Sequence, residues 1–540
     1  MSILRIYSAQ INPIVGDFAG NTQKIIAAAQ KAREQQSDLL ITPEMVLTGY
    51  PPEDLLFRPA LQQRVQEQLD FLAAEVTDIT LVVGYPIIHE GQVFNAAGVL
   101  HQGQWIAEYH KACLPNDQVF DEKRYFTAGQ QPVVVEIQGI KLGLLICEDL
   151  WHSGPAQASV EAGAETLLVL NASPWHQGKH LERVELARQR VQPLQVPLIY
   201  CNVIGGQDEL LFDGASFAVN SQGELLASAP ALQEAGLITE LETTSAGVDL
   251  LPSERATWPE ALPYLYAALV LGLQDYVNKS GFKGVVLGMS GGIDSALSAA
   301  IAVDALGKER VTGVMLPYHY TSSMSLEDAE EEARLLDIDY QVYPIAPMVD
   351  SFMTSLEQTF AGTQRDTTEE NLQARCRGTL LMALSNKLGL MVLSTGNKSE
   401  VAVGYCTLYG DMVGGYNAIK DVYKTLVFQL AEWRNQQGRV IPQRIIDRPP
   451  SAELAPDQKD EDSLPPYSVL DKLLEGYIEL DKSAADLLAE GFSEEDIRRV
   501  IGLVDRNEYK RYQAAPGTRV TFRGFGKDRR YPLVNKWPVF

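Results

Sequence analysis

The first 245 residues alternate between short apolar runs and amphipathic stretches, with turn residues between them. Apolar positions recur at helical spacing over 21–35 and 61–75, which predicts two helices. The predicted strands are Leu4–Gln10, Leu39–Thr42, Ile79–Tyr85, Ala96–His101, Gln104–Tyr109, Val133–Ile137, Lys141–Ile146, Glu165–Leu170, Leu198–Val203 and Ala215–Val219. Glycine-containing turns between neighbouring strands indicate hairpins. The pattern predicts a strand-rich α/β domain over residues 1–245.

The pattern changes after this domain. Residues 246–262 are polar, contain prolines and show little periodicity, so we expect a linker there. From residue 263 to 540, strands and helices alternate, which is typical of a doubly wound parallel sheet. The strands are expected at Gly284–Met289, Val311–Leu316, Tyr340–Ile345 and Leu390–Ser394, and the helices at 264–280, 294–306, 326–336 and 371–388. Ser325 is the expected cap of the helix that starts at Leu326.

Composition and charge narrow the class of protein. The 540 residues are 46% hydrophobic and 21% charged, as in soluble multidomain proteins. The 45 basic and 70 acidic residues give a net charge of −25, which disfavours nucleic acid and anionic membranes as partners. Five scattered cysteines indicate a reducing compartment. With no predicted signal peptide or membrane helix, we expect a cytoplasmic protein.

A candidate phosphate loop, LGMSGGIDS, spans Leu287–Ser295 between a predicted strand and a predicted helix. Its three glycines let backbone N–H groups approach an anion, and a helix N-terminus favours phosphate. A carboxylate beside a phosphate is repulsive unless a cation lies between them, so Asp294 predicts Mg²⁺. The loop lacks the lysine of the G-x-x-x-x-G-K-[ST] motif. A plain strand-to-helix turn is the alternative.

The S-G-G-x-D-S string is the signature of the PP-loop ATP pyrophosphatases, which adenylylate a substrate and release pyrophosphate. Further strings cover most of residues 260–540 and resemble NAD synthetase. They are EENLQARCRG at Glu369–Gly378, LSTGNKSE at Leu393–Glu400, YCTLYGDM at Tyr405–Met412, RPPSAELAPDQKDEDSLPPYSVLD at Arg448–Asp471 and YKRYQAAPG at Tyr509–Gly517.

The resemblance implies binding sites for ATP, Mg²⁺ and deamido-NAD⁺. The implied ATP contacts are Gly288, Met289, Ser290, Gly291, Gly292, Ile293, Asp294, Ser295 and Thr395. The implied deamido-NAD⁺ contacts are Asn371, Glu400 and Lys510, and the implied Mg²⁺ ligands are Asp294 and Glu400. Lys424 is a candidate for stabilising the pentavalent phosphoryl charge. Arg375 and Arg377 are further candidate anchors or helix-surface residues.

Three polar residues each follow a predicted strand in the first domain: Glu44, Lys111 and Cys147. A cysteine attacks best as a thiolate, so it needs a base or a cation nearby. Glu44 has the chemistry to accept the thiol proton, and Lys111 to stabilise an oxyanion. Sequence spacing does not show that the three converge. A buried structural cysteine and two surface charges are the alternative.

PEM at 43–45, HKACLPN at 110–116 and CEDLW at 147–151 resemble the nitrilase (carbon–nitrogen hydrolase) family, which is built on an αββα sandwich. The resemblance implies that Glu44 is the base, Lys111 the oxyanion stabiliser and Cys147 the nucleophile. NASPWHQGK at 171–179 resembles the glutamine-binding strand of the glutaminase members. The implied glutamine-binding residues are Glu122, Glu148, Ser173 and Lys179. Asp117 stands where the related glutaminases usually have tyrosine, which puts one glutamine contact in doubt.

The order of the two domains resembles the glutamine-dependent NAD⁺ synthetase family. The resemblance implies glutamine, ATP and deamido-NAD⁺ as substrates, and a homo-oligomer that dimerises through the synthetase domain or is larger. A different PP-loop amidotransferase, related to GMP or asparagine synthetase, is one alternative. A silent dinucleotide-binding homologue and a nitrilase with a structural tail are two others. The motifs present in both halves argue against all three.

Overall fold

The computed structural model describes residues 3–245, 247–451, 453–455, 460 and 464–540. The chain divides into two compact units, Met1–Ala261 and Leu262–Phe540. Among the described residues, no helix combines the length and the apolar character that crossing a membrane requires.

The first unit contains two large sheets. The seven-stranded sheet has the order β15 (Gly247–Leu250), β14 (Ala235–Thr244), β1 (Ile3–Gln10), β2 (Leu39–Ile41), β3 (Thr80–His89), β4 (Gln92–His101) and β5 (Gln104–His110). The six-stranded sheet has the order β13 (Leu225–Ser228), β12 (Phe217–Val219), β9 (Leu198–Asn202), β8 (Thr166–Asn171), β7 (Ile140–Ile146) and β6 (Val134–Ile137). A small antiparallel ribbon joins β10 (Ile204–Gln207) to β11 (Leu210–Asp213).

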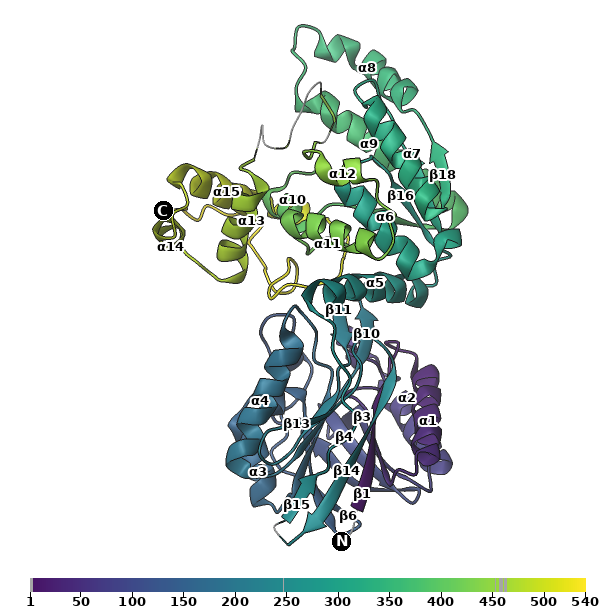
Figure 1. Ribbon diagram of the computed structural model, residues 1–540, viewed down its shortest axis with the longest axis vertical. Helices are drawn as coiled ribbons and strands as arrows, with labels where there is room; N and C mark the ends of the chain where they lie inside the picture. The colour runs from purple at the N-terminus through teal and green to yellow at the C-terminus, as the bar shows by residue number, and fades with distance from the viewer. Residues whose placement is uncertain (1–2, 246, 452, 456–459, 461–463) are drawn as a thin grey trace. The chain divides into compact units, whose positions relative to one another are not determined.

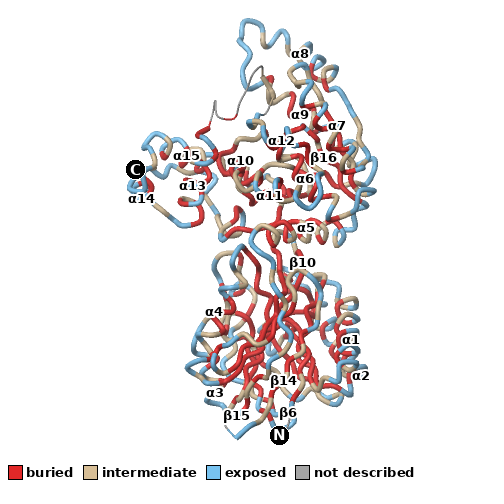
Figure 2. The backbone as a smooth tube through the Cα atoms, in the orientation of Figure 1, coloured by how far each residue is buried: buried red, intermediate tan, exposed pale blue. Residues whose placement is uncertain are grey.

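The two sheets pack face to face between two layers of helices. Alternate residues of β1 and β7, including Leu4, Ile6, Leu142 and Leu144, meet in one apolar core between the sheets. The helices α1 (Phe18–Glu34) and α2 (Leu61–Glu75) cover the outer face of the first sheet. The outer face of the second sheet is covered by α3 (Ser153–Glu161) and α4 (Lys179–Leu194). The central strands of both sheets, such as β2 and β8, are buried, and the outer faces of the helices are exposed (Figure 2). The predicted αββα sandwich is confirmed.

The predicted linker over 246–262 begins within this sandwich. β15 pairs antiparallel with β14, from Leu241 opposite Leu250 to Thr244 opposite Gly247. The division between the units falls after Ala261. Residues 247–250 are therefore part of the first sheet, and the linker prediction is wrong for them. Residue 246 lies outside the described residues.

The second unit is built on a five-stranded parallel sheet. Its order is β18 (Asp339–Val342), β17 (Val311–Met315), β16 (Val285–Gly288), β19 (Met391–Ser394) and β20 (Tyr416–Asn417). The chain moves outward on one side of β16 and then continues on the other side, so its crossover helices cover both faces of the sheet. This confirms the predicted doubly wound sheet. Its strand order reverses between β16 and β19, where such sheets bind ligands.

Helices complete the second unit around this sheet. They are α5 (Ala261–Lys279), α6 (Ile293–Leu306), α7 (Ser323–Leu336), α8 (Ala346–Phe360), α9 (Thr367–Leu388), α10 (Lys398–Val403), α11 (Lys424–Gln436), α12 (Gln443–Asp447), α13 (Tyr467–Leu474), α14 (Ala484–Ala489), α15 (Glu494–Arg506) and α16 (Glu508–Arg511). The helices α10, α13, α14 and α15 share a separate apolar core. The cap of α7 is Ser322, whose side chain accepts the N–H of Ser325, so the predicted cap at Ser325 is wrong.

Candidate active sites

Glu44 lies in the turn after β2 and is 1% exposed. Asn95 Nδ2 donates to its Oε1 at 2.7 Å, and the N–H of Ala172 donates to its Oε2 at 2.8 Å. β3 passes this turn at Gly84, where a Cβ would lie 2.5 Å from the nitrogen of Met45. The glycine therefore lets two backbones meet, and the carboxylate is held by Asn95 of β4 and by the backbone that follows β8.

Lys111 follows β5 and is also 1% exposed. Its Nζ donates to Glu44 Oε1 at 2.8 Å and to Glu122 Oε1 at 2.9 Å. Tyr50 donates its hydroxyl to the same Glu122 oxygen at 2.9 Å. Burial acts to lower the pKa of Lys111, but Glu122 and Glu44 outweigh it and hold the pKa well above its usual range. The ammonium is therefore a permanent buried positive charge.

Cys147 follows β7 as the first residue of a tight 3₁₀ turn, Cys147–Leu150. Its φ of 45° is left-handed, an uncommon conformation for a non-glycine residue that often occurs at functional sites. Burial and Glu44 raise the pKa of the thiol well above its usual range, although Lys111 acts in the opposite direction. The thiol is therefore protonated at rest, and it needs a base before it attacks.

Asp149 connects the Cys147 turn to the Lys111 loop, and our sequence reasoning assigned it no role. Its Oδ2 accepts the N–H of Ile146 at 2.9 Å, and its Oδ1 accepts the N–H of Cys113 at 2.7 Å. The carboxylate is fully buried. It lies within the CEDLW string, but only the fold reveals its partner Cys113, which is 36 residues away in sequence.

The glutamine-binding residues implied by the resemblance occupy different environments. Burial raises the pKa of Glu122 to about 7, and it also raises the pKa of Glu148. Asp117 lies close enough to Glu148 to raise that pKa further. Ser173 is buried, and its Oγ accepts from Arg183 Nε at 3.0 Å.

Lys179 is the first residue of α4. Its Nζ donates to Glu182 at 3.0 Å and lies 4.0 Å from the centre of the Trp151 ring. Trp151 directly follows the 3₁₀ turn of Cys147. The structure thus brings Glu44, Lys111, Glu122 and Glu148 within electrostatic reach of the Cys147 thiol, because each affects its pKa. Lys179 contacts Trp151, the residue that follows the same turn.

The second unit has a cavity of about 300 Å³ at the switch point between β16 and β19. The predicted residues that line it are Gly288, Met289, Ser290, Gly292, Ile293, Asp294, Ser295, Thr395, Glu400 and Lys424. Arg377 of α9 also lines the cavity. The candidate phosphate loop therefore lines a cavity and is more than a plain strand-to-helix turn.

The geometry of the loop suits an anion. Gly291 has a φ of 74°, and a Cβ there would lie 2.4 Å from the carbonyl oxygen of Ser325. Ser290 Oγ accepts the N–H of Gly292 at 3.2 Å and lies 3.1 Å from Ser295 Oγ. Because α6 begins directly afterwards at Ile293, its unpaired N–H groups lie at the loop.

Two carboxylates and one lysine meet beside the loop. Lys424 is 2% exposed, forms an ion pair with Asp294 and lies 3.2 Å from Glu400 Oε1. Burial and Asp294 together raise the pKa of Glu400 to about 8, although Lys424 acts to lower it. Asn397 Nδ2 donates to Asp294 Oδ1 at 2.9 Å. Two carboxylates at a phosphate loop are the donor set that Mg²⁺ shares with nucleotide phosphates.

Comparisons with known proteins agree with this division of the chain. Residues 5–248 match the model of the carbon–nitrogen hydrolase family, and residues 265–514 match that of NAD synthase. The chain is 49% identical to the glutamine-dependent NAD(+) synthetase of Acinetobacter baylyi, with 99% of each chain covered. The chain belongs to the glutamine-dependent NAD(+) synthetase family. The Thermotoga maritima enzyme is 42% identical, again over 99% of each chain.

Solved structures of the family match the whole fold. The enzyme from Acinetobacter baumannii in complex with adenosine diphosphate is 48% identical, covers 100% of both chains and aligns with a TM-score of 0.81. The enzyme from Cytophaga hutchinsonii, 23% identical, covers 99% of this chain and 98% of its own, with a TM-score of 0.83. The second match shows that the fold persists at low identity.

Some predicted residues of the synthetase unit lie outside the lining of the cavity. Asn371 Oδ1 accepts from Thr407 Oγ1 at 2.8 Å, and Lys510 Nζ donates to two backbone carbonyls of the chain between α10 and α11. Their contact with deamido-NAD⁺ stays a prediction. Arg375 is exposed and also lies outside the lining, whereas Arg377 lines the cavity.

Sequence reasoning assigned no role to several side chains at this cavity. Arg448 donates to the carbonyl of Gly291 at 2.7 Å and to Ser325 Oγ at 3.0 Å. Glu453 accepts from the same serine at 2.7 Å. Arg448 and Glu453 both belong to the RPPSAELAP string. The sequence therefore showed the motif, but it did not show that these side chains contact the phosphate loop and Ser325. Residues 452, 456–459 and 461–463 of that string lie outside the described residues.

Proposed function

We propose that this chain makes NAD⁺ from deamido-NAD⁺, ATP and ammonia that it releases from glutamine. The observation that carries the proposal is the occurrence of two sites in one chain. A buried Glu–Lys–Cys cluster occupies the first unit, and a phosphate loop with an open cavity occupies the second. The family of the chain supports the same function.

Glutamine hydrolysis starts at Cys147. Because the thiol is protonated at rest, Glu44 takes its proton as sulfur attacks the side-chain carboxamide. Lys111 stabilises the oxyanion, because its ammonium group is held in place by ion pairs with Glu44 and Glu122. Glu44 returns the proton to the departing ammonia, which leaves a γ-glutamyl thioester on Cys147. Water activated by Glu44 then releases glutamate.

Activation of deamido-NAD⁺ takes place in the cavity of the second unit. The N–H groups of Ser290–Ser295 and the start of α6 hold the phosphates of ATP. Asp294 and Glu400 fit Mg²⁺, which when bound neutralises phosphate charge. Lys424 stabilises the charge that develops as the nicotinate carboxylate attacks the α-phosphate. The products of this step are an acyl-adenylate and pyrophosphate.

Ammonia then attacks the acyl-adenylate, which yields NAD⁺ and AMP. Only neutral ammonia is a nucleophile, and ammonium dominates at neutral pH. We therefore propose that ammonia reaches the acyl-adenylate by a path sheltered from bulk water. We further propose a cytoplasmic homo-oligomer that dimerises through the synthetase unit. Glu122, Glu148, Ser173 and Lys179 are the proposed glutamine contacts.

The test is an assay of the purified chain with deamido-NAD⁺, ATP and Mg²⁺, supplied with either glutamine or ammonium chloride. We expect NAD⁺ in both cases, with AMP and pyrophosphate formed in equal amounts and glutamate formed only from glutamine. Xanthylate and aspartate, offered in place of deamido-NAD⁺, should give no AMP. AMP formation with either of them, and none with deamido-NAD⁺, would overturn the proposal.

A further inference from the structure

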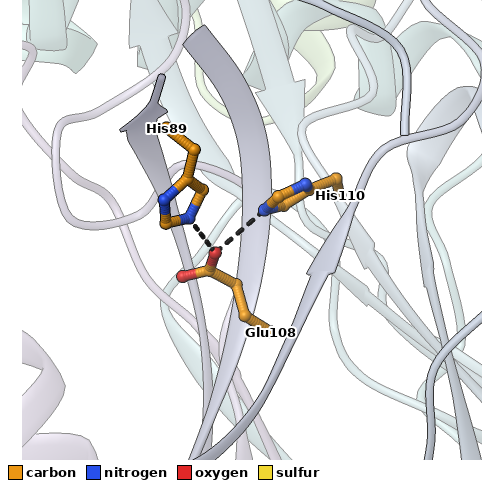
Figure 3. Close-up of side chains that lie close together, drawn as sticks. All are labelled: His89, Glu108 and His110. Atoms are coloured by element: carbon orange, nitrogen blue, oxygen red, sulfur yellow. Dashed lines mark hydrogen bonds and ion pairs between the residues drawn. The ribbon is translucent and has the colours of Figure 1, made fainter. Parts of the chain in front are cut away.

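Two histidines and a glutamate converge on the outer face of the first sheet, away from the Cys147 cluster. His89 Nε2 lies 2.6 Å from Glu108 Oε1, and His110 Nε2 lies 2.8 Å from the same oxygen (Figure 3). The three ligand atoms lie within 4.8 Å of one another. Within the part of the chain that the structure describes, no other group of three His, Cys, Asp or Glu side chains meets this condition.

The strand register accounts for the convergence. β3 ends at His89, and β5 carries Glu108 and His110 two residues apart on one face. β4 lies between these strands, with Phe94 on the same face. The His110 ring stacks on Phe94 at 4.2 Å between centroids, and the His89 ring lies 6.3 Å from it. The apolar ring thus supports both imidazoles and directs them toward the carboxylate.

A second set of contacts holds the glutamate from behind. Tyr85 donates its hydroxyl to Glu108 Oε2 at 2.9 Å. The two residues reach each other across Gly98, where a Cβ would lie 2.3 Å from the tyrosine oxygen. Because Gly98 has no side chain, Tyr85 can reach Oε2 of Glu108. The other carboxylate oxygen, Oε1, then faces the two histidines. Outer partners that fix a ligand in this way are typical of metal sites.

The charge state and exposure of the group also suit a cation. Burial acts to raise the pKa of Glu108, but hydrogen bonds from His110, His89 and Tyr85 outweigh it and hold the pKa at about 2. The His89 side chain is 51% exposed and that of His110 is 25% exposed, so an ion can enter from solvent.

We propose that His89, Glu108 and His110 form a binding site for a divalent transition metal ion such as Zn²⁺, separate from both active sites. Two imidazoles and one carboxylate are ligands that Zn²⁺ accepts, with the remaining position open to water. Ligand atoms around a tetrahedral Zn²⁺ lie about 3.3 Å apart, so the two present contacts of 2.6 and 2.8 Å open by about 0.5 to 0.7 Å. The bound ion fastens the end of β3 to β5 across β4.

The competing explanation is a glutamate that simply accepts hydrogen bonds from two imidazoles. Isothermal titration of the full-length chain, first treated with EDTA and then exchanged into chelator-free buffer, separates the two. Zn²⁺ is the titrant, and the variants are His110→Gln, Glu108→Gln and His319→Gln. His319 is an exposed histidine of the second unit and provides the matched control.

We expect one Zn²⁺ per chain in the starting protein and in His319→Gln. Binding should weaken by at least about 100-fold in His110→Gln and in Glu108→Gln, because each loses one of three ligands. Zn²⁺ should also raise the unfolding temperature of the starting protein and leave that of the two cluster variants unchanged. Equal Zn²⁺ affinity in all four proteins would overturn the site.

The Cys147 thiol is a competing ligand for Zn²⁺, so Co²⁺ absorption spectra of the chain and of Cys147→Ala complete the test. The proposed site has no sulfur ligand, and we expect Co²⁺ ligand-field bands without a sulfur charge-transfer band, equal in both proteins. A sulfur charge-transfer band that disappears in Cys147→Ala, with no Co²⁺ bound in that variant, would assign the metal to the thiol and refute the proposal.

Discussion

The reactive side chains of the Cys147 site are almost fully buried, whereas the phosphate-loop site opens onto a cavity of about 300 Å³. In the first, Glu44, Lys111 and Glu122 are each at most 4% exposed and pair with one another. In the second, the buried Lys424 pairs with Asp294 and Glu400, which both line the cavity. The proposed substrates differ in the same way: one is a small amide, and the others are large polyanions.

The difference in exposure between the two sites matches the charges that each reaction requires. Hydrolysis of an amide needs a few charges at fixed positions, and a low-dielectric, prearranged cluster supplies them. Phosphoryl chemistry needs positive charge that matches arriving anions. A carboxylate–lysine cluster lining a cavity has carboxylates for a metal ion and a lysine for the phosphates. The two sites should therefore fail separately when mutated.

The largest expected effect comes from Cys147→Ala. Glutamine-dependent NAD⁺ formation should fall by about 10⁴-fold or more, because the nucleophile is lost. Ammonia-dependent formation should stay within about twofold, since the cavity in the other unit is untouched. Parallel assays with glutamine and ammonium chloride measure both. Retained use of glutamine would refute the assignment of the nucleophile.

Asp294→Ala should affect both nitrogen sources equally. Loss of a carboxylate at the phosphate loop should lower NAD⁺ formation by about 10³-fold, since metal-assisted charge stabilisation is worth several kcal/mol. Glutamine hydrolysis, measured as glutamate in the absence of ATP, should be unchanged. Normal ammonia-dependent turnover in this variant would exclude the proposed role of Asp294.

Asn397 sharpens the comparison, because it acts through Asp294. It is fully buried, donates to Asp294 and caps α10 by accepting the N–H of Glu400 at 3.0 Å. Asn397→Ala should lower NAD⁺ synthesis by about 10- to 100-fold. Asn397→Asp keeps an acceptor for the cap but lacks the donor, so it should lose activity with a smaller loss of thermal stability. Full activity of Asn397→Asp would contradict the positioning role.

Glu122→Gln has the smallest expected effect and tests the buried Cys147 site through the pH dependence of stability. Burial raises the pKa of Glu122 from 4.5 to about 7, so between these values the folded chain holds a proton that the unfolded chain has lost. The contribution of this group to stability therefore falls as pH rises from 4.5 to 7. The glutamine side chain cannot titrate, so the unfolding temperature of the starting protein minus that of the variant should fall across this range. The exposed Glu136→Gln is the reference, and a difference that grows with pH would contradict the raised pKa.

Local patterns predicted most elements of the fold. The second helix has its predicted bounds, 61–75, because apolar spacing alone marks it. β15 was missed, because its four residues become a strand only by pairing with β14. α9 begins at Thr367 instead of residue 371, since Asp366 and Glu369 form a capping box that periodicity does not reveal. Short strands and helix ends thus depend on partners more than on pattern.

The candidate sites show the same division between what local sequence predicts and what depends on distant partners. The sequence by itself determined the chemistry: Glu44, Lys111, Cys147 and Asp294 carry reactive groups and stand in motifs that resemble known families. Only the tertiary structure decided which groups meet. Residues far apart along the chain approach within hydrogen-bond distance at strand ends, where burial and neighbouring charges together shift the pKa values of Lys111 and Cys147. The side chains that hold the reactive ones, among them Asp149, Asn397 and Arg448, were found only in the fold, since a positioning role is defined by a partner distant in sequence.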